Sequence, residues 1–92
     1  MWRVLWSKKV EKQLSKIPHH IADKFRAWTL AIEENGMPYV RTLKGFHDEP
    51  LKGDRHGQRS VRLNQAYRAI YVEYPNGEIK IVEVIEVNKH EY

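Results

Sequence analysis

The chain has 92 residues, the length of one small domain spanning residues 1–92, and 41% of them are hydrophobic, which is enough for a packed core. Sixteen Lys and Arg against twelve Asp and Glu give a formal net charge of +4, which favours nucleic acid or an acidic protein as a partner. The absence of cysteine excludes disulfides, thiol catalysis and thiolate metal sites, and it fits a reducing compartment. No apolar run is long enough for a signal-peptide core or a membrane span, so we expect a cytoplasmic protein without membrane contact.

The N-terminal part of the sequence predicts one strand followed by two helices. The strand covers residues 2–6, and Ser7 is a suitable N-cap for a helix that ends near Pro18. A second helix is predicted from about His20 to Glu34, followed by the C-cap signal Asn35-Gly36. Its apolar residues recur at helical spacing and form one stripe: Ile21, Phe25, Trp28 and Ile32.

The C-terminal part predicts a sheet. Residues 37–50 have no strong period, so we expect an ordered connection there. Strands are predicted at 60–64, 67–74 and 79–87, and Asn76-Gly77 marks a tight hairpin turn between the last two. The last strand is apolar on both faces, which favours a central, doubly covered position. The predicted fold class is α+β, with two N-terminal helices packed on a small antiparallel sheet in the order β-α-α-β-β-β.

Positive charge is concentrated in residues 51–68, LKGDRHGQRSVRLNQAYR. The basic residues of this stretch are Lys52, Arg55, Arg59, Arg62 and Arg68, accompanied by His56 and opposed by one acid, Asp54. Two glycines make residues 52–57 a loop whose backbone can approach a ligand closely. A solvated basic face is the simplest explanation, but charges that converge from a loop and two strands favour an anion site. Phosphate is the anion that arginine forks match best.

Two of these arginines are predicted to face each other. With a three-residue loop at 64–66, Arg62 pairs with Arg68 across an antiparallel ladder, and paired residues point to the same face. Two guanidiniums in that position repel each other unless an anion binds between them.

Metal binding is not favoured by the sequence. His47-Asp48-Glu49 contains ligand-type side chains, but neighbours in an extended loop diverge and no second cluster complements them. We therefore expect no metal and no other cofactor.

These residues carry a family resemblance. The segment Leu51-Lys52-Gly53-Asp54-Arg55, the Arg62 and Tyr67-Arg68 strand pair, and the ending Val87–Tyr92 resemble the RelE/ParE superfamily of bacterial toxins, most closely its HigB-like branch. The resemblance covers nearly the whole chain and implies a RelE-like fold. It also implies a cytoplasmic toxin that cleaves messenger RNA in the ribosomal A site and is neutralised by a cognate antitoxin.

The resemblance further implies site residues. Arg62 and Arg68 match strand positions that hold the phosphate, His90 matches the basic position after the last strand, and Tyr92 matches the terminal aromatic. The assigned catalytic residues are therefore Arg62, Arg68, His90 and Tyr92. The assigned substrate-binding residues are Lys52, Arg55, His56, Arg59 and Lys89.

Metal-independent RNA cleavage is compatible with these side chains. The 2′-hydroxyl must lose a proton, the transition state needs its added negative charge stabilised, and the departing 5′-oxygen must gain a proton. Arg62 and Arg68 suit the second need, and His90 or His56 the first or third. Tyr92 suits stacking on a base.

Two other classes compete with the ribonuclease. ParE-like relatives share the fold, target DNA gyrase and cut no RNA. A nucleic-acid-binding module without toxicity is the third class, but the sequence has no helix rich in base-reading residues.

Overall fold

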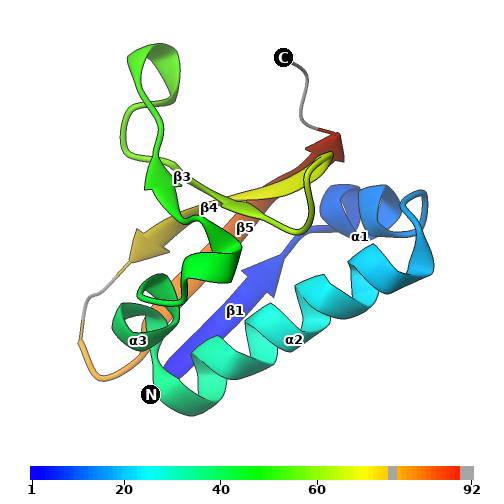
Figure 1. The fold of residues 1–92 in the computed structure, drawn as a ribbon. Coiled ribbons are helices and arrows are strands. Elements are labelled where there is room, and N and C mark those ends of the chain that lie inside the picture. Colours follow the sequence, from blue (N-terminus) through cyan, green and yellow to red (C-terminus); the bar gives the residue numbers. More distant parts are fainter. Residues whose placement is uncertain (75–76, 90–92) are drawn as a thin grey trace.

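A computed structural model describes residues 1–74 and 77–89 of the chain (Figure 1). The elements in chain order are β1 (Trp2–Trp6), α1 (Lys8–Leu14), α2 (His19–Asn35), α3 (Met37–Arg41), the 3₁₀ helix η1 (Lys44–Phe46), β2 (Glu49–Pro50), the 3₁₀ helix η2 (Gly53–Arg55), β3 (Arg59–Arg62), β4 (Tyr67–Tyr74) and β5 (Lys80–Lys89). No helix in the described ranges is long and apolar enough to cross a membrane.

The strands form one five-stranded sheet in the order β1-β5-β4-β3-β2. β5 pairs with β1 in parallel and with β4 antiparallel, so the first and last strands of the chain lie side by side. β3 pairs antiparallel with both β4 and β2. The predicted α+β class is confirmed, but the predicted order was wrong in two respects: the sheet has the additional two-residue strand β2, and it is mixed, not purely antiparallel.

The predicted apolar stripe of α2 forms the centre of the core. Ile21, Phe25, Trp28 and Ile32 are buried, and they belong to one cluster with the sheet residues Val4, Ala69, Tyr71, Val82, Val84 and Val87. The rings of Trp28 and Tyr71 lie 5.4 Å apart between centroids. The helices therefore cover one face of the sheet.

Both predicted helices are capped as the sequence indicates. The Ser7 hydroxyl accepts a hydrogen bond from the Val10 amide at 3.4 Å, and Gly36 ends α2 with φ 88°. A side chain at Gly36 would meet Trp2, since an added Cβ would lie 3.0 Å from the indole nitrogen. Gly36 therefore satisfies both the positive φ and the close packing of β1 against the end of α2.

Two segments differ from their predicted structure, and a third prediction lies partly outside the described residues. α3 lies in the segment 37–50, where the sequence predicts no regular structure. The turn signal falls partly on Pro75 and Asn76, which lie outside the described residues, although β4 and β5 do pair antiparallel. β5 is hydrogen-bonded on both edges, but helices cover only one of its faces, so the prediction of a doubly covered strand was wrong.

Two backbone amides that have no strand partner donate hydrogen bonds to side chains of the helices. The Val4 amide of the edge strand β1 donates to the Glu33 carboxylate of α2 at 3.1 Å. Pairing of β1 with β5 reaches only as far as Val84, and beyond it the Val87 amide donates to Gln13 of α1 at 2.8 Å. These two bonds fix the helices against the sheet and satisfy backbone amides that no strand reaches.

Candidate active site

Arg62 and Arg68 lie directly opposite each other on β3 and β4, as predicted. Their strand neighbours Val61 and Ala69 are buried in the core, so both arginines project from the opposite side of the sheet. We call this side the open face and define it by Arg62, Arg68, Glu86 and Asn88. Arg62 is exposed and makes no ion pair with a described residue.

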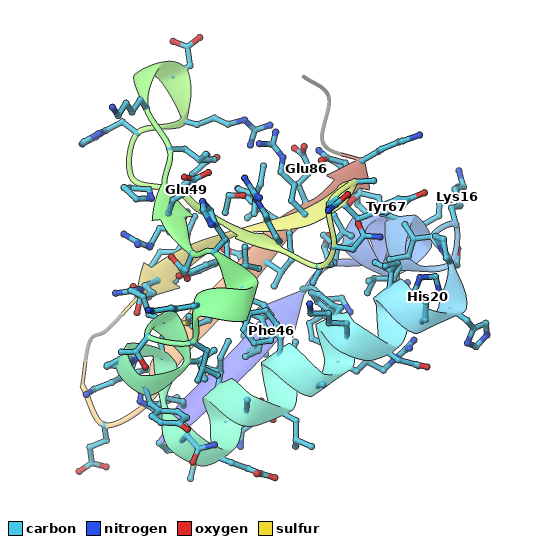
Figure 2. All side chains as sticks on the ribbon, in the orientation of Figure 1. Lys16, His20, Phe46, Glu49, Tyr67 and Glu86 are labelled. Carbon is cyan, nitrogen blue, oxygen red and sulfur yellow. The ribbon has the colours of Figure 1, made fainter. Side chains whose placement is uncertain are left out.

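A chain of hydrogen bonds crosses the open face from the loop to β4. Arg55 donates to Glu86 at 2.8 Å, Asn88 donates to the other oxygen of Glu86, and Arg68 donates to the Asn88 amide oxygen at 3.4 Å. Figure 2 shows Glu86 on the side of the sheet from which the loop around η2 rises. The loop, β4 and β5 thus bring their polar side chains together on one surface.

The loop of residues 51–58 presents one arginine to the sheet. The Leu51 amide donates to the Gln58 carbonyl at 2.9 Å and closes the loop. Arg55 also donates to the Gln58 side chain at 2.9 Å, which orients its guanidinium toward Glu86. Lys52 and His56 are exposed, so among the predicted loop residues Arg55 has the defined contacts to the open face.

Two predicted substrate-binding residues project from the other face. Arg59 pairs with Tyr71, a core residue, and its Nε donates to Asp48 at 2.7 Å. Lys89 pairs with Tyr67, which packs against the core, whereas the neighbouring Asn88 pairs with Arg68. The structure therefore does not bring Arg59 or Lys89 together with Arg62 and Arg68. His90 and Tyr92 lie outside the described residues.

Glu86 and Asn88 are site residues that the sequence analysis missed. The near-continuous apolar run predicts a strand that is apolar on both faces, although Glu83, Glu86 and Asn88 interrupt it. In the structure, Ile70 pairs with Glu86 and Tyr71 pairs with Val84, so Ile85 is a bulge residue without a partner in register. The bulge shifts the alternation by one residue and points Glu86 to the open face.

A second polar cluster lies on the helix side of the sheet. The Asp48 side chain is 1% exposed and accepts hydrogen bonds from Arg59 and, at 2.5 Å, from the Tyr71 hydroxyl. Arg41 of α3 donates to the same hydroxyl at 3.3 Å and pairs with Glu73. Two arginines and two carboxylates balance in charge, so this cluster joins α3, β3 and β4 without offering a free charge to a ligand.

The hollow beside this cluster has a volume of ≈ 340 Å³ and is lined by Arg41, Thr42, Leu43, Lys44, His47 and Asp48.

The buried Tyr71 hydroxyl is held in its protonated form. Burial raises the pKa of Tyr71 above its ordinary value, and the hydrogen bond donated to Asp48 raises it further. Because the folded pKa lies above the unfolded value of about 10, the unfolded chain loses this proton first, and stability falls as pH rises above about 10.

Tyr71→Phe is therefore expected to have a pH-dependent cost. At neutral pH the lost hydrogen bond should lower the free energy of unfolding by about 1–2 kcal/mol. The difference between wild type and variant should shrink above pH 10, where the wild type loses the Tyr71 contribution. Urea unfolding of both proteins between pH 7 and pH 11 measures this difference in the free energy of unfolding. A difference that does not change with pH would contradict the raised pKa of the Tyr71 hydroxyl.

The sequence matches no family model and no curated protein. Comparison of structures gives matches over nearly the whole chain. The YoeB/ParE toxin from Agrobacterium tumefaciens has a TM-score of 0.74 at 20% identity, with 97% of this chain and 99% of that chain covered. YafQ from Escherichia coli BL21(DE3) has a TM-score of 0.71 at 15% identity, with 98% and 94% covered.

A third match is the RelE–RelB complex from Pyrococcus horikoshii OT3, with a TM-score of 0.69 at 23% identity and coverage of 96% and 93%. The fold is that of the RelE- and YoeB-type toxins. A RelE-type fold at these identities fixes the architecture of the chain and leaves its activity to the site residues. The predicted RelE-like fold is thereby confirmed, whereas the HigB-like branch stays a prediction.

Proposed function

We propose that the protein is the toxin of a type II toxin–antitoxin system, an endoribonuclease that cleaves messenger RNA on the ribosome and so inhibits translation in the cytoplasm. The observation that carries this proposal is the opposed pair Arg62 and Arg68 on the open face, with Arg55 reaching the same face from the loop. Three guanidiniums from three elements form a surface for the phosphates of an RNA strand. The fold shared with the YoeB/ParE toxin from A. tumefaciens supports the same conclusion.

The proposed mechanism is metal-independent acid–base catalysis. Arg62 and Arg68 hold the scissile phosphate and stabilise the charge that develops on its oxygens. His90 and Tyr92 follow directly after β5, whose end carries Asn88 beside Arg68. A histidine there suits proton transfer near neutral pH, and a tyrosine suits stacking on a base. His56 and Lys52 are proposed as secondary contacts to the RNA strand.

A cognate antitoxin is the proposed protein partner. The P. horikoshii neighbour is a complex of RelE with RelB, and a neighbour from Staphylococcus aureus is a complex of YoeB with YefM. An acidic antitoxin segment would complement the arginines of the open face and would prevent RNA from reaching them.

The alternative is a ParE-like toxin that binds DNA gyrase without cutting RNA, which the double name of the A. tumefaciens neighbour keeps open. Addition of the purified protein to a translating extract, with message 5′ ends mapped by primer extension, separates the two functions. New 5′ ends within codons are expected for the ribonuclease. Intact messages together with inhibited gyrase supercoiling would replace the proposal with its alternative.

Removal of His90-Glu91-Tyr92 is expected to abolish cleavage at a modest cost in stability, since terminal residues contribute few buried contacts. His90→Gln keeps a hydrogen-bonding side chain but cannot transfer a proton. The variant should therefore bind ribosomes normally and cleave message more slowly than the wild type by a factor of about 10² or more. Single-turnover cleavage on programmed ribosomes measures the rate. A truncated chain that folds and cleaves at the wild-type rate would move the acid and base elsewhere.

A further inference from the structure

Glu86 places a negative charge within a surface otherwise suited to phosphate. Its side chain is 22% exposed, and the residues beside it in the ladder, Ile70 and Ser60, are buried. A carboxylate in such a partly desolvated position repels a phosphate more strongly than it would in water. Phosphate binding alone therefore does not account for Glu86, which leaves two roles for it: to hold Arg55, or to contact a hydrogen-bond donor on the substrate.

The contacts of Glu86 fix both of its oxygens. One accepts from Arg55 and the other from Asn88, and each keeps a free lone pair for a further donor. The charged groups that face Glu86 are Arg55 from the loop and, beyond Asn88, Arg68 from β4 and Arg62 from β3. A carboxylate held in place by two donors is a group that can accept a proton from a substrate.

A single amide separates Glu86 from the proposed phosphate site. Asn88 donates to Glu86 through its nitrogen and accepts from Arg68 through its oxygen, so the guanidinium and the carboxylate lie one side chain apart. In RNA, the 2′-hydroxyl is separated from its neighbouring phosphorus only by two ribose carbons and the 3′-oxygen. If a phosphate binds at Arg68, the 2′-hydroxyl of the ribose joined to it through the 3′-oxygen would therefore be within reach of Glu86.

From these contacts we propose that Glu86 is the general base of RNA cleavage, an inference that rests on the proposed function. Glu86 takes the proton of the 2′-hydroxyl, the 2′-oxygen forms a bond to phosphorus, and the bond from phosphorus to the 5′-oxygen breaks. The departing 5′-oxygen takes a proton from the acid, which the proposed function places at His90. The products are a 2′,3′-cyclic phosphate and a 5′-hydroxyl, so atoms and charge balance without a cofactor.

The competing role for Glu86 is to hold Arg55 in place. Three variants separate the two roles: Glu86→Gln, Arg55→Ala and the double variant. Single-turnover cleavage of message on programmed ribosomes is measured for each from pH 4.5 to 8.5, together with binding of a 2′-deoxy analogue that cannot be cut. The protein is used as the full chain, and thermal unfolding verifies that each variant folds.

A general base predicts four results. Glu86→Gln slows cleavage by about 10²-fold or more and removes the decline of the rate at low pH. Arg55→Ala slows cleavage less and keeps that decline, and the double variant is slower than Arg55→Ala alone. Binding of the 2′-deoxy analogue is not weakened in Glu86→Gln, because the substitution removes only a charge that repels phosphate. Glu86→Asp, which keeps the carboxylate, retains the low-pH decline at a reduced rate and provides the test if Glu86→Gln does not fold.

Equal rates for Glu86→Gln, Arg55→Ala and the double variant would overturn the proposal in favour of a positioning role. So would a low-pH decline that survives in Glu86→Gln. If the wild type cuts message and Glu86→Gln cuts it equally well, the inference fails while the proposed function stands. If the wild type cuts no message on the ribosome, both fail together.

Discussion

Asp48→Ala is expected to lower the free energy of unfolding by about 3 kcal/mol, the lower end of the range for removing one partner of a buried ion pair. The Asp48 side chain is 1% exposed and accepts from Arg59 at 2.7 Å and from Tyr71 at 2.5 Å. Its removal leaves Arg59 and the Tyr71 hydroxyl without their acceptor, while Arg41 keeps its ion pair with Glu73. The lower end applies because Arg59 and Arg41 are 25% and 32% exposed, so water can solvate them in part.

Urea unfolding followed by tryptophan fluorescence measures this change, since Trp28 packs against Tyr71 within the core. Asp54→Ala is the matched control, because Asp54 lies exposed in η2 and should change stability by less than about 0.5 kcal/mol. Asp48→Asn keeps the shape and an acceptor, so its cost should fall between the two. Equal midpoints for Asp48→Ala and Asp54→Ala would show that the cluster does not stabilise the sheet.

Local patterns were sufficient to predict most elements. The β4 bounds, the α2 stripe and the Ser7 cap follow from periodicity and capping chemistry within a few residues of sequence. The register of Arg62 opposite Arg68 also followed, because a short loop fixes the pairing of the strands that it joins. These features depend on neighbours in the chain.

Features that depend on distant residues were not predicted. The parallel pairing of β1 with β5 joins the two ends of the chain, and no local pattern specifies such a partner. α3 has only five residues, too few for an apolar stripe to identify a helix. Its Arg41 pairs with Glu73, a residue of β4 that is distant in the sequence.

The predicted and observed site residues differ in part because β3 begins one residue earlier than the predicted strand. The predicted strand began at residue 60, which left Arg59 in the loop and free to join Arg62. The structure begins β3 at Arg59, and residues three apart in a strand point to opposite faces. Arg59 consequently joins Asp48 on the helix side. Glu86 was missed because the bulge at Ile85 changes which residues of β5 share a face.

Arg62→Ala and Arg68→Ala are each expected to abolish toxicity while the fold stays intact. Both side chains project from the open face, so neither removes core packing, and the loss of like-charge repulsion should leave the free energy of unfolding unchanged or raise it. Toxicity should fall because a phosphate held by both guanidiniums loses one of its two charge-assisted contacts and its orientation. Growth arrest after induced expression, with protein levels verified by immunoblot, measures the effect.

Arg26→Ala is the matched control for this pair, since it removes the same charge from an exposed position of α2 that pairs only with Asp23 at 3.6 Å in the described chain. Arg62→Lys and Arg68→Lys keep the charge but lose the planar fork, and they should give intermediate toxicity if the fork binds the phosphate. If the alanine variants arrest growth as the wild type does, the anion site must lie elsewhere. If the lysine variants are fully toxic, long-range charge alone holds the RNA, and the opposed geometry of Arg62 and Arg68 has no part in orienting the phosphate for cleavage.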